Sequence, residues 1–162
     1  MNPKRKASTL YVCQAACIAA LYVILTLLSH ALGLASGPIQ IRLSEMLCLL
    51  PIFLPAAIPG VTIGCLLANL LTGAVFLDIL IGPIATLIGA LGTYWLRRYR
   101  LLAPLPPVLA NTLLIPFVLA YGYGAEEAIW LMMLTVGAGE VISIYALGLL
   151  MVKALTPFFP KT

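Results

Sequence analysis

The sequence contains very few charged residues. Only 9% of its 162 residues are Asp, Glu, Lys or Arg, against about 25% in an average soluble protein, and 63% are hydrophobic. The mean hydropathy of +1.13 leaves too few polar groups to cover the surface of a fold in water. The composition therefore excludes a soluble enzyme, a nucleic-acid-binding module and a disordered tail.

Motifs for catalysis and for energy conversion are also missing. There is no GxxxxGK[ST] phosphate-binding loop, no CxxC pair and no Ser/His/Asp set on plausible helix faces. The four cysteines, Cys13, Cys17, Cys48 and Cys65, are interpreted as small apolar packing residues. We therefore expect a protein that is not an enzyme and binds no metal or cofactor of its own. Uphill transport by such a chain requires an ion gradient or a partner ATPase.

Long apolar runs are present instead, and they predict an all-α membrane protein with six transmembrane helices. The stretch 43–75 would extend about 50 Å as one helix, and prolines interrupt it, so we divide it in two. A proline-containing linker is expected at 104–107. The predicted helices, within one membrane domain of residues 1–162, cover approximately 10–34, 43–54, 58–74, 76–96, 108–122 and 128–152.

The basic residues lie in short clusters that indicate the orientation. Lys4–Lys6 and Arg97–Arg100 are both expected on the cytoplasmic side under the positive-inside rule, so an even number of spans must separate them. Two further spans bring the tail with Lys153 and Lys161 to the same side. We therefore predict that both termini are cytoplasmic.

The remaining charged residues are predicted to lie outside the cytoplasmic half of the membrane domain. A charge in a membrane helix is costly, and this makes its position informative about function. Arg42 and Glu45 share a helix face, Asp78 begins a helix, and Glu140 lies near mid-membrane beside small residues. With two neutral partners they form the predicted substrate site, which consists of Gln40, Arg42, Glu45, Asn69, Asp78 and Glu140.

Structural roles for these residues remain open from the sequence. Arg42 would pair with Asp78 at the interface or with Glu45 inside the bundle, and Asn69 would join two helices by a hydrogen bond. Asn111 is interpreted as a structural residue far from the cluster, because it follows the cytoplasmic arginines closely. His30 is interpreted as an interfacial group.

Two surface features have alternative interpretations. Tyr121, Tyr123 and Trp130 either cover a flat ligand or form an aromatic belt at the outer interface. The first helix contains two overlapping Ala-x-x-x-Ala pairs, which allow close helix approach and serve either a partner helix or internal packing. The alanines of these pairs are Ala15, Ala16, Ala19 and Ala20.

Four stretches, in order along nearly the whole chain, resemble the QueT family of substrate-binding (S) components of energy-coupling factor (ECF) transporters. These stretches are Gly37–Glu45, Gly64–Leu70, Asp78–Gly82 with Ala85–Leu87, and Gly139–Glu140 with Tyr145–Gly148. The resemblance implies the six-helix ECF S-component fold in a bacterial cytoplasmic membrane. It also implies an EcfT-type coupling protein, docked on the alanine pairs, and two ATPase subunits that use ATP and Mg.

The cargo that the resemblance implies is a queuosine precursor, a 7-deazaguanine-type base. Its ring edge offers N–H donors to Glu45, Asp78 or Glu140, while Arg42 would meet the ring carbonyl. An aminomethyl substituent would add a positive charge. The alternative is a proton-coupled secondary transporter of a small cationic or donor-rich solute, with Glu140 as the proton relay, although the sequence shows no evident inverted repeat.

Overall fold

The computed structural model describes residues 3–35 and 39–159, with side chains from residue 8 onward, and this part of the chain is helical with irregular connections. Gly37 and Pro38 of the first family-like stretch lie outside the described residues. The elements are α1 (Pro3–Ala31), the 3-10 helix η1 (Leu43–Ile52), α2 (Ala57–Leu71), α3 (Phe76–Trp95), α4 (Leu105–Gly122), α5 (Ile129–Glu140), the π-helix η2 (Val141–Gly148), α6 (Leu149–Leu155) and the 3-10 helix η3 (Thr156–Phe158).

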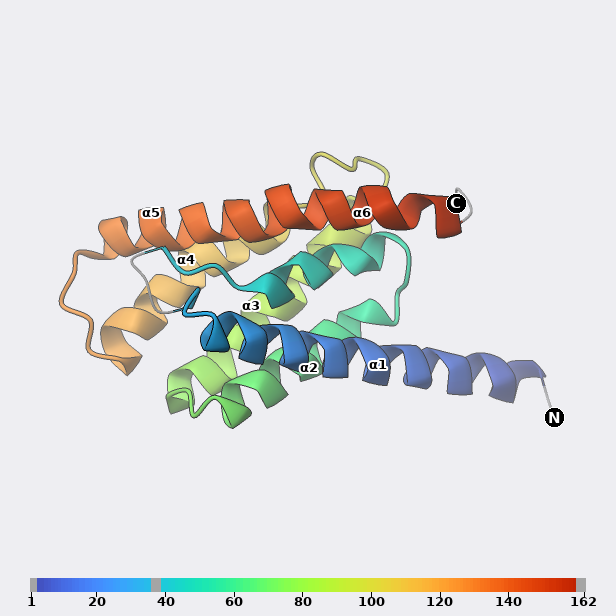
Figure 1. The fold of residues 1–162 in the computed structure, drawn as a ribbon, viewed down its shortest axis with the longest axis horizontal. Coiled ribbons are helices and arrows are strands. Elements are labelled where there is room, and N and C mark those ends of the chain that lie inside the picture. Colours follow the sequence, from blue (N-terminus) through green and yellow to red (C-terminus); the bar gives the residue numbers. More distant parts are fainter. Residues whose placement is uncertain (1–2, 36–38, 160–162) are drawn as a thin grey trace.

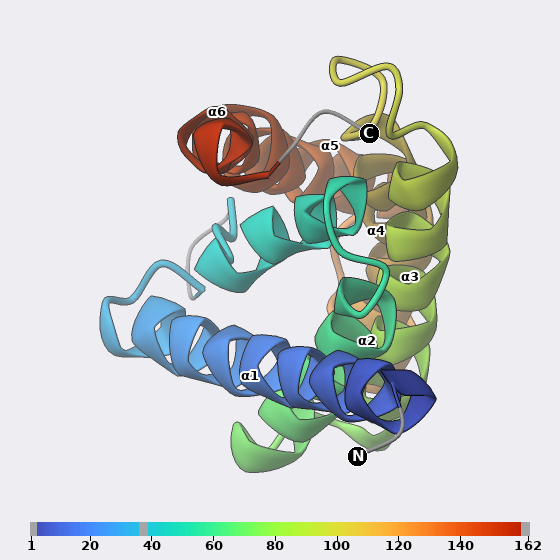
Figure 2. The same cartoon turned by 90° about the vertical axis from the view of Figure 1, so that its right-hand side faces the viewer.

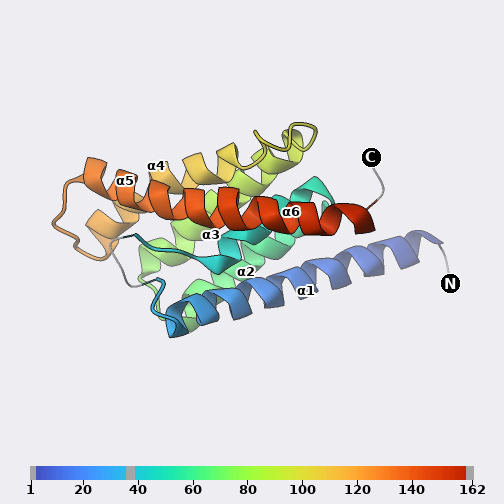
Figure 3. The ribbon, with the colours of Figure 1, turned by 45° about the horizontal axis from the view of Figure 1, so that its top comes forward.

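Two long helical segments run along the molecule. One is α1, and the other is formed by α5, η2 and α6 in succession, with the start of α1 and the end of α6 at the same end of the molecule (Figure 1). Viewed from that end, η1 lies between α1 and α6, while α3 and α4 form the opposite side (Figure 2). The same central position of η1 is visible from above (Figure 3), and η1 contacts α1, α2, α3, α6 and η2.

Four helices in the described part of the chain are long and apolar enough to cross a membrane. They cover Ser8–Ala31, Phe76–Trp95, Leu105–Gly122 and Ile129–Phe158. The other two helical segments are shorter: η1 rises about 20 Å and α2 about 22 Å, against a hydrocarbon core of about 30 Å. The protein is therefore an all-helical, multi-pass membrane protein with two shorter helical segments, of which η1 is almost wholly buried.

The short segments are separated where the prolines lie. η1 ends at Ile52 and α2 begins at Ala57, with Pro51 in the last turn of η1 and Pro55 in the connection. Proline removes a backbone donor and clashes with the preceding turn, which prevents one continuous helix over 43–75. The short connection reverses the chain, and α2 runs back along α1 (Figure 1).

The proline-containing linker expected at 104–107 is instead the beginning of a helix. α4 starts at Leu105, with Pro106 and Pro107 in its first turn. Proline suits this position because the first backbone N–H groups of a helix have no intrahelical partner. The prolines also pack closely on α3, since a Cβ atom on Gly89 would lie 2.6 Å from Pro107 Cα and one on Gly92 would overlap Pro106.

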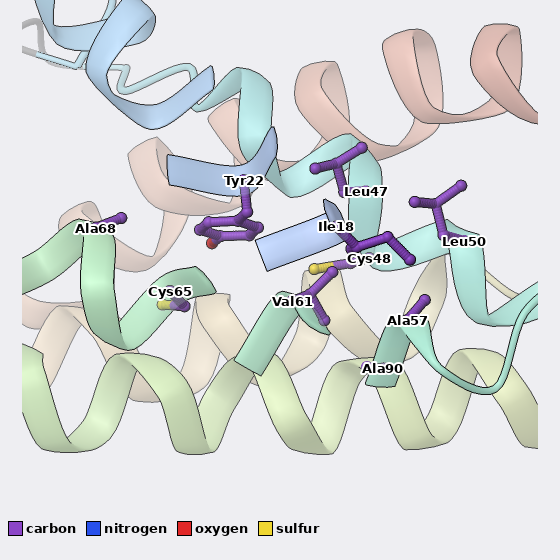
Figure 4. Packing of buried hydrophobic residues seen from close by; sticks show 10 residues of the cluster. All are labelled: Ile18, Tyr22, Leu47, Cys48, Leu50, Ala57, Val61, Cys65, Ala68 and Ala90. Atoms are coloured by element: carbon purple, nitrogen blue, oxygen red, sulfur yellow. The ribbon is translucent and has the colours of Figure 1, made fainter. Parts of the chain in front are cut away.

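The apolar core surrounds η1 and the middle of α1. Figure 4 shows Tyr22 of α1 beside Cys48 of η1 and Cys65 of α2, in a cluster that also contains Leu47 and Val61. Cys48 and Cys65 are buried, whereas Cys13 and Cys17 are exposed on α1. The core therefore holds η1 against α1 and α2 and fixes the position of the polar residues at its start.

Candidate functional site

A cavity of about 410 Å³ is lined by residues near the end of α1 and at the α2–α3 turn. These segments lie at the end of the molecule opposite the start of α1 and the end of α6 (Figure 1). This volume is within the range of small-molecule sites in proteins, about 300–1,000 Å³. The end of α1, the segment before η1, the α2–α3 turn and the end of α4 contribute to its walls. Its lining residues are Thr26, His30, Ala35, Gln40, Arg42, Asn69, Thr72, Gly73, Ala74, Asp78, Leu119 and Tyr123.

An extended segment, residues 39–42, forms one wall of this cavity, and we call it the strap. The Ile41 N–H donates to the Leu34 carbonyl at 2.9 Å, and the Arg42 N–H donates to Ser143 Oγ at 3.2 Å. A Cβ atom at Gly139 would overlap the Gln40 carbonyl oxygen, so only glycine permits this approach of α5 to the strap. The strap is therefore held between α1 and the α5–η2 segment, and it directs Gln40 and Arg42 to the cavity.

Asp78 is buried at the start of α3 and also lines the cavity. The Asn69 side-chain amide donates to the Asp78 carbonyl at 2.9 Å and lies 3.4 Å from Asp78 Oδ1. The Tyr123 hydroxyl donates to Asp78 Oδ2 at 3.2 Å. Gly82, one turn later on α3, provides the space for this arrangement, because a Cβ there would lie 2.7 Å from Asn69 Nδ2. The carboxylate of Asp78 is thus fixed at the cavity wall.

Glu45 is also buried, but it does not line the cavity. Its Oε1 accepts a hydrogen bond from the Tyr22 hydroxyl, and its Oε2 accepts from Cys48 Sγ and from Asn111 Nδ2, both at 3.3 Å. All three donors come from the protein, so Glu45 joins α1, η1 and α4 behind the strap.

Asn111 therefore belongs to the polar cluster, and its interpretation as a remote residue was wrong. The helix that carries it begins at Leu105 rather than at 108, which places Asn111 about 9 Å along the helix axis from its start. The polar cluster also extends further into the bundle than expected, because η1 carries Glu45 inward from the strap. Both differences bring Asn111 and Glu45 together.

Glu140 lies on the other side of the strap, at the end of α5. Its side chain is 7% exposed, and among the described residues no hydrogen-bond partner reaches its Oε2. A small second cavity of about 10 Å³ adjoins it and is lined by Gln40, Arg42, Ile115, Val136 and Glu140. We call this cavity the inner chamber. Because Gln40 and Arg42 line both cavities, the inner chamber lies next to the larger one.

The four charged residues of the predicted site interact electrostatically. Of the charged groups near Arg42, Asp78 has the strongest electrostatic interaction with its guanidinium, and Glu45 has the second strongest. Glu140 interacts with Glu45, Asn111 and Arg42. The residues form two layers, with Gln40, Arg42, Asn69 and Asp78 at the main cavity and Glu45 and Asn111 behind it. Glu140 faces the inner chamber.

Of the other aromatic residues and the histidine considered in the sequence, only some line the main cavity. Tyr123 and His30 line the main cavity, whereas Tyr121 and Trp130 do not, and all four side chains are exposed. His30 Nδ1 lies 3.0 Å from the Thr26 carbonyl. No group of three or more His, Cys, Asp or Glu residues in the described part of the chain is arranged to hold a metal ion.

The four alanines of α1 divide into two pairs with different surroundings. Ala19 is buried and Ala15 is partly buried, and both face α2, where Cβ atoms on Gly60 and Gly64 would lie 2.9 and 3.0 Å from their carbonyl oxygens. Ala16 and Ala20 are exposed. Internal packing therefore accounts for the first pair, and the second pair remains on the surface.

Comparison with known proteins gives a match to a family model over most of the chain. The model of the QueT transporter family matches residues 12–157. A curated relative, "Queuosine precursor transporter QueT" of Lactococcus lactis subsp. cremoris (strain MG1363), is 37% identical over 97 residues. That alignment covers 59% of this chain and 57% of the relative, less than two thirds of the relative's length. No solved structure matches the chain. From the family match over residues 12–157, we conclude that this chain belongs to the QueT transporter family.

Proposed function

We propose that this chain is the substrate-binding subunit of an ATP-driven ECF importer, and that its cargo is a queuosine precursor of the 7-deazaguanine type. The observation that carries the proposal is the 410 Å³ cavity, which is lined by both Arg42 and the fixed carboxylate of Asp78. The family match and the name of the 37% identical relative support the choice of cargo.

The chemistry of the cavity suits a flat, donor-rich ring. A guanine-type edge presents N–H groups next to a carbonyl, and these need an acceptor and a donor at neighbouring positions. Asp78 supplies the acceptor, and Arg42 supplies donors to the carbonyl. Asn69 and Gln40 each add an amide that both donates and accepts, and Tyr123 provides an aromatic face at the cavity wall.

The proposed topology has six spans with both termini in the cytoplasm of a bacterium. It is supported by the common end at which α1 begins and α6 finishes (Figure 1). The basic connection Arg97–Arg100 is near α6 as well, because Arg100 Nη1 donates to Thr156 Oγ1 at 3.0 Å. The cavity at the far end would then open to the outside, where an importer captures its cargo.

We propose an EcfT-type coupling protein and two ATPase subunits as the partners. Within the alanine motif, Ala16 and Ala20 are the better candidates for contact with the coupling protein, because Ala15 and Ala19 already pack on α2. Small exposed residues four apart allow another helix to approach closely. ATP and Mg would be used by the ATPases.

The direct test is ligand binding to the purified chain. We expect 7-aminomethyl-7-deazaguanine to bind with submicromolar affinity and Asp78→Ala to weaken binding at least tenfold, about 1.4 kcal/mol. Glu126→Ala is the matched control, because Glu126 is an exposed acid in the loop before α5. Equal losses in both variants, or no binding to the wild type, would refute the proposed site.

Transport then separates this proposal from the proton-coupled alternative. Cells that contain the chain should accumulate the deazaguanine only when a coupling protein and ATPases are also present. Uptake that continues without ATPases and stops when the pH gradient is removed would instead establish a secondary transporter, for which Glu140 is the candidate relay.

A further inference from the structure

The inner chamber contains a carboxylate oxygen that the protein leaves without a partner. Glu140 Oε2 is buried and accepts no hydrogen bond from the described residues, whereas both oxygens of Glu45 accept hydrogen bonds from protein donors. A buried polar atom without a partner is costly, more so for a charged group. Such an atom beside a cavity indicates that something else occupies the position.

The charges around the chamber favour a positive occupant. The strap contributes Arg42 and Gln40 to its wall, while Glu45 of η1 and Asn111 of α4 interact with Glu140 without lining the chamber. Arg42 interacts most strongly with Asp78 and next with Glu45, so its single positive charge is already shared. Three carboxyl groups thus lie near one guanidinium, and this excess would attract a further positive charge placed beside Glu140.

The size of the chamber limits the occupant to one heavy atom or a small group. Its volume of about 10 Å³ corresponds to roughly one water-sized site, which is also sufficient for a single ammonium nitrogen. A purine-like ring does not fit. Ile115 and Val136 form the apolar part of the wall, so the chamber's polar contacts concentrate on Glu140 and the strap.

The chamber is adjacent to the main cavity at Gln40 and Arg42, which line both. To reach Glu140, a short substituent on a ring in the main cavity would have to pass between the side chains of Gln40 and Arg42. We infer that the inner chamber is a charge-selective subsite, in which Glu140 binds a single protonated nitrogen at the tip of a substituent on the ligand. This inference rests on the proposed function, because the ring must bind first in the main cavity.

The experiment compares two ligands that differ only in charge at the tip, 7-aminomethyl-7-deazaguanine and 7-ethyl-7-deazaguanine. We expect the wild type to bind the aminomethyl compound at least tenfold more tightly than the ethyl compound. Glu140→Gln, of nearly the same shape, should reduce this preference to less than threefold. Asp78→Asn should weaken both ligands by similar factors, because Asp78 meets the ring.

A second variant tests the chamber without changing any charge. Val136→Leu fills the chamber with one additional methylene, and it should lower the affinity for the aminomethyl compound to that of unsubstituted 7-deazaguanine. The unsubstituted base should bind this variant and the wild type alike. Thermal unfolding of each variant shows whether the protein is folded, and the Val136 variant remains available if Glu140→Gln does not fold.

The outcomes separate this inference from the proposed function. If neither deazaguanine binds the wild type, the proposed function fails, and the subsite fails with it. If both bind with equal affinity, or if Glu140→Gln keeps the full preference, the cavity still binds the base and only the charge-selective subsite is refuted.

Discussion

The two ends of the molecule differ in how their helices meet. At the end where α1 begins, α3 and α4 approach until Gly89 and Gly92 contact prolines, and no room remains between them. At the opposite end, the strap and the α2–α3 turn keep the helices apart around a cavity of about 410 Å³. One end is built from glycine contacts that exclude side chains, and the other from buried polar residues that line a space.

The comparison shows that small residues have different tasks at the two ends. Gly92 brings two helices together, so its loss should affect the stability of the fold. Gly139 brings a helix against the strap, so its loss should affect the position of Gln40 and Arg42. Substitutions at these glycines therefore test whether ligand affinity at the cavity end and folding stability at the packed end change independently of each other.

The largest effect is expected for Gly139→Ala. A Cβ atom at this position overlaps the Gln40 carbonyl oxygen, and because that atom belongs to the backbone the strap itself must move. Forcing additional volume into a packed site typically costs about 1–3 kcal/mol of folding stability. Because the displaced strap also carries Gln40 and Arg42, we expect the affinity for the deazaguanine to fall by up to roughly a hundredfold, about 3 kcal/mol. Isothermal titration of the deazaguanine into purified variant measures this loss.

Gly137→Ala is the control for this substitution. It lies two residues earlier on α5, where a Cβ would lie 3.2 Å from Thr112 Oγ1, a side-chain atom that needs to move by only a few tenths of an ångström. We expect its affinity to stay within threefold of the wild type. If Gly139→Ala binds as tightly as Gly137→Ala, the strap does not determine the site.

The sequence predicted the fold class and most of the polar residues at the cavity, because charge is rare in this chain. Four of the six residues predicted for the substrate site, Gln40, Arg42, Asn69 and Asp78, line the main cavity, and their binding of substrate stays a prediction. In a chain with only five acidic residues, each one within an apolar run is conspicuous. Scarcity of charge, rather than any motif, provided this information.

The separation of the acids into two layers was not predictable from their spacing. Glu45 is three residues from Arg42, yet its carboxylate turns away from the cavity because Tyr22 and Asn111 donate to it from other helices. Contacts between distant helices decide this orientation, and linear spacing contains no information about them. The role of Gly139 was missed for the same reason, since its neighbour Gln40 is far away in the chain.

The next largest effect is expected for Gly92→Ala, at the packed end. The added Cβ overlaps Pro106, whose ring has little freedom to move, so the variant should lose about 1–3 kcal/mol of unfolding free energy. Its affinity for the deazaguanine should remain unchanged, because the cavity lies at the other end. Thermal unfolding in detergent and titration of the folded protein measure the two quantities.

Leu91→Ala provides the matched control on the same helix. Leu91 is 38% exposed and adjacent to Gly92 in the sequence, so its truncation should change the unfolding free energy much less. A loss of affinity in Gly92→Ala at full stability would show that the two ends are coupled, which would contradict their separation.

The smallest effect is expected for Tyr123→Phe, which removes one hydroxyl from the cavity wall. That hydroxyl donates to Asp78 Oδ2 at 3.2 Å while the ring remains in place, so the affinity for the deazaguanine should fall about three- to fivefold, or roughly 1 kcal/mol.

Burial, with a further contribution from the charge of Asp78, raises the pKa of Tyr123 above its ordinary value of 10. Because a raised pKa keeps the phenol protonated, the donor is retained at pH 7 to 9, and the ratio of wild-type to variant affinity should be constant over that range. Titration at three pH values measures this ratio. A ratio that falls to one by pH 9 would mean that the phenol ionises there, and the Tyr123–Asp78 contact would then not hold the cavity wall.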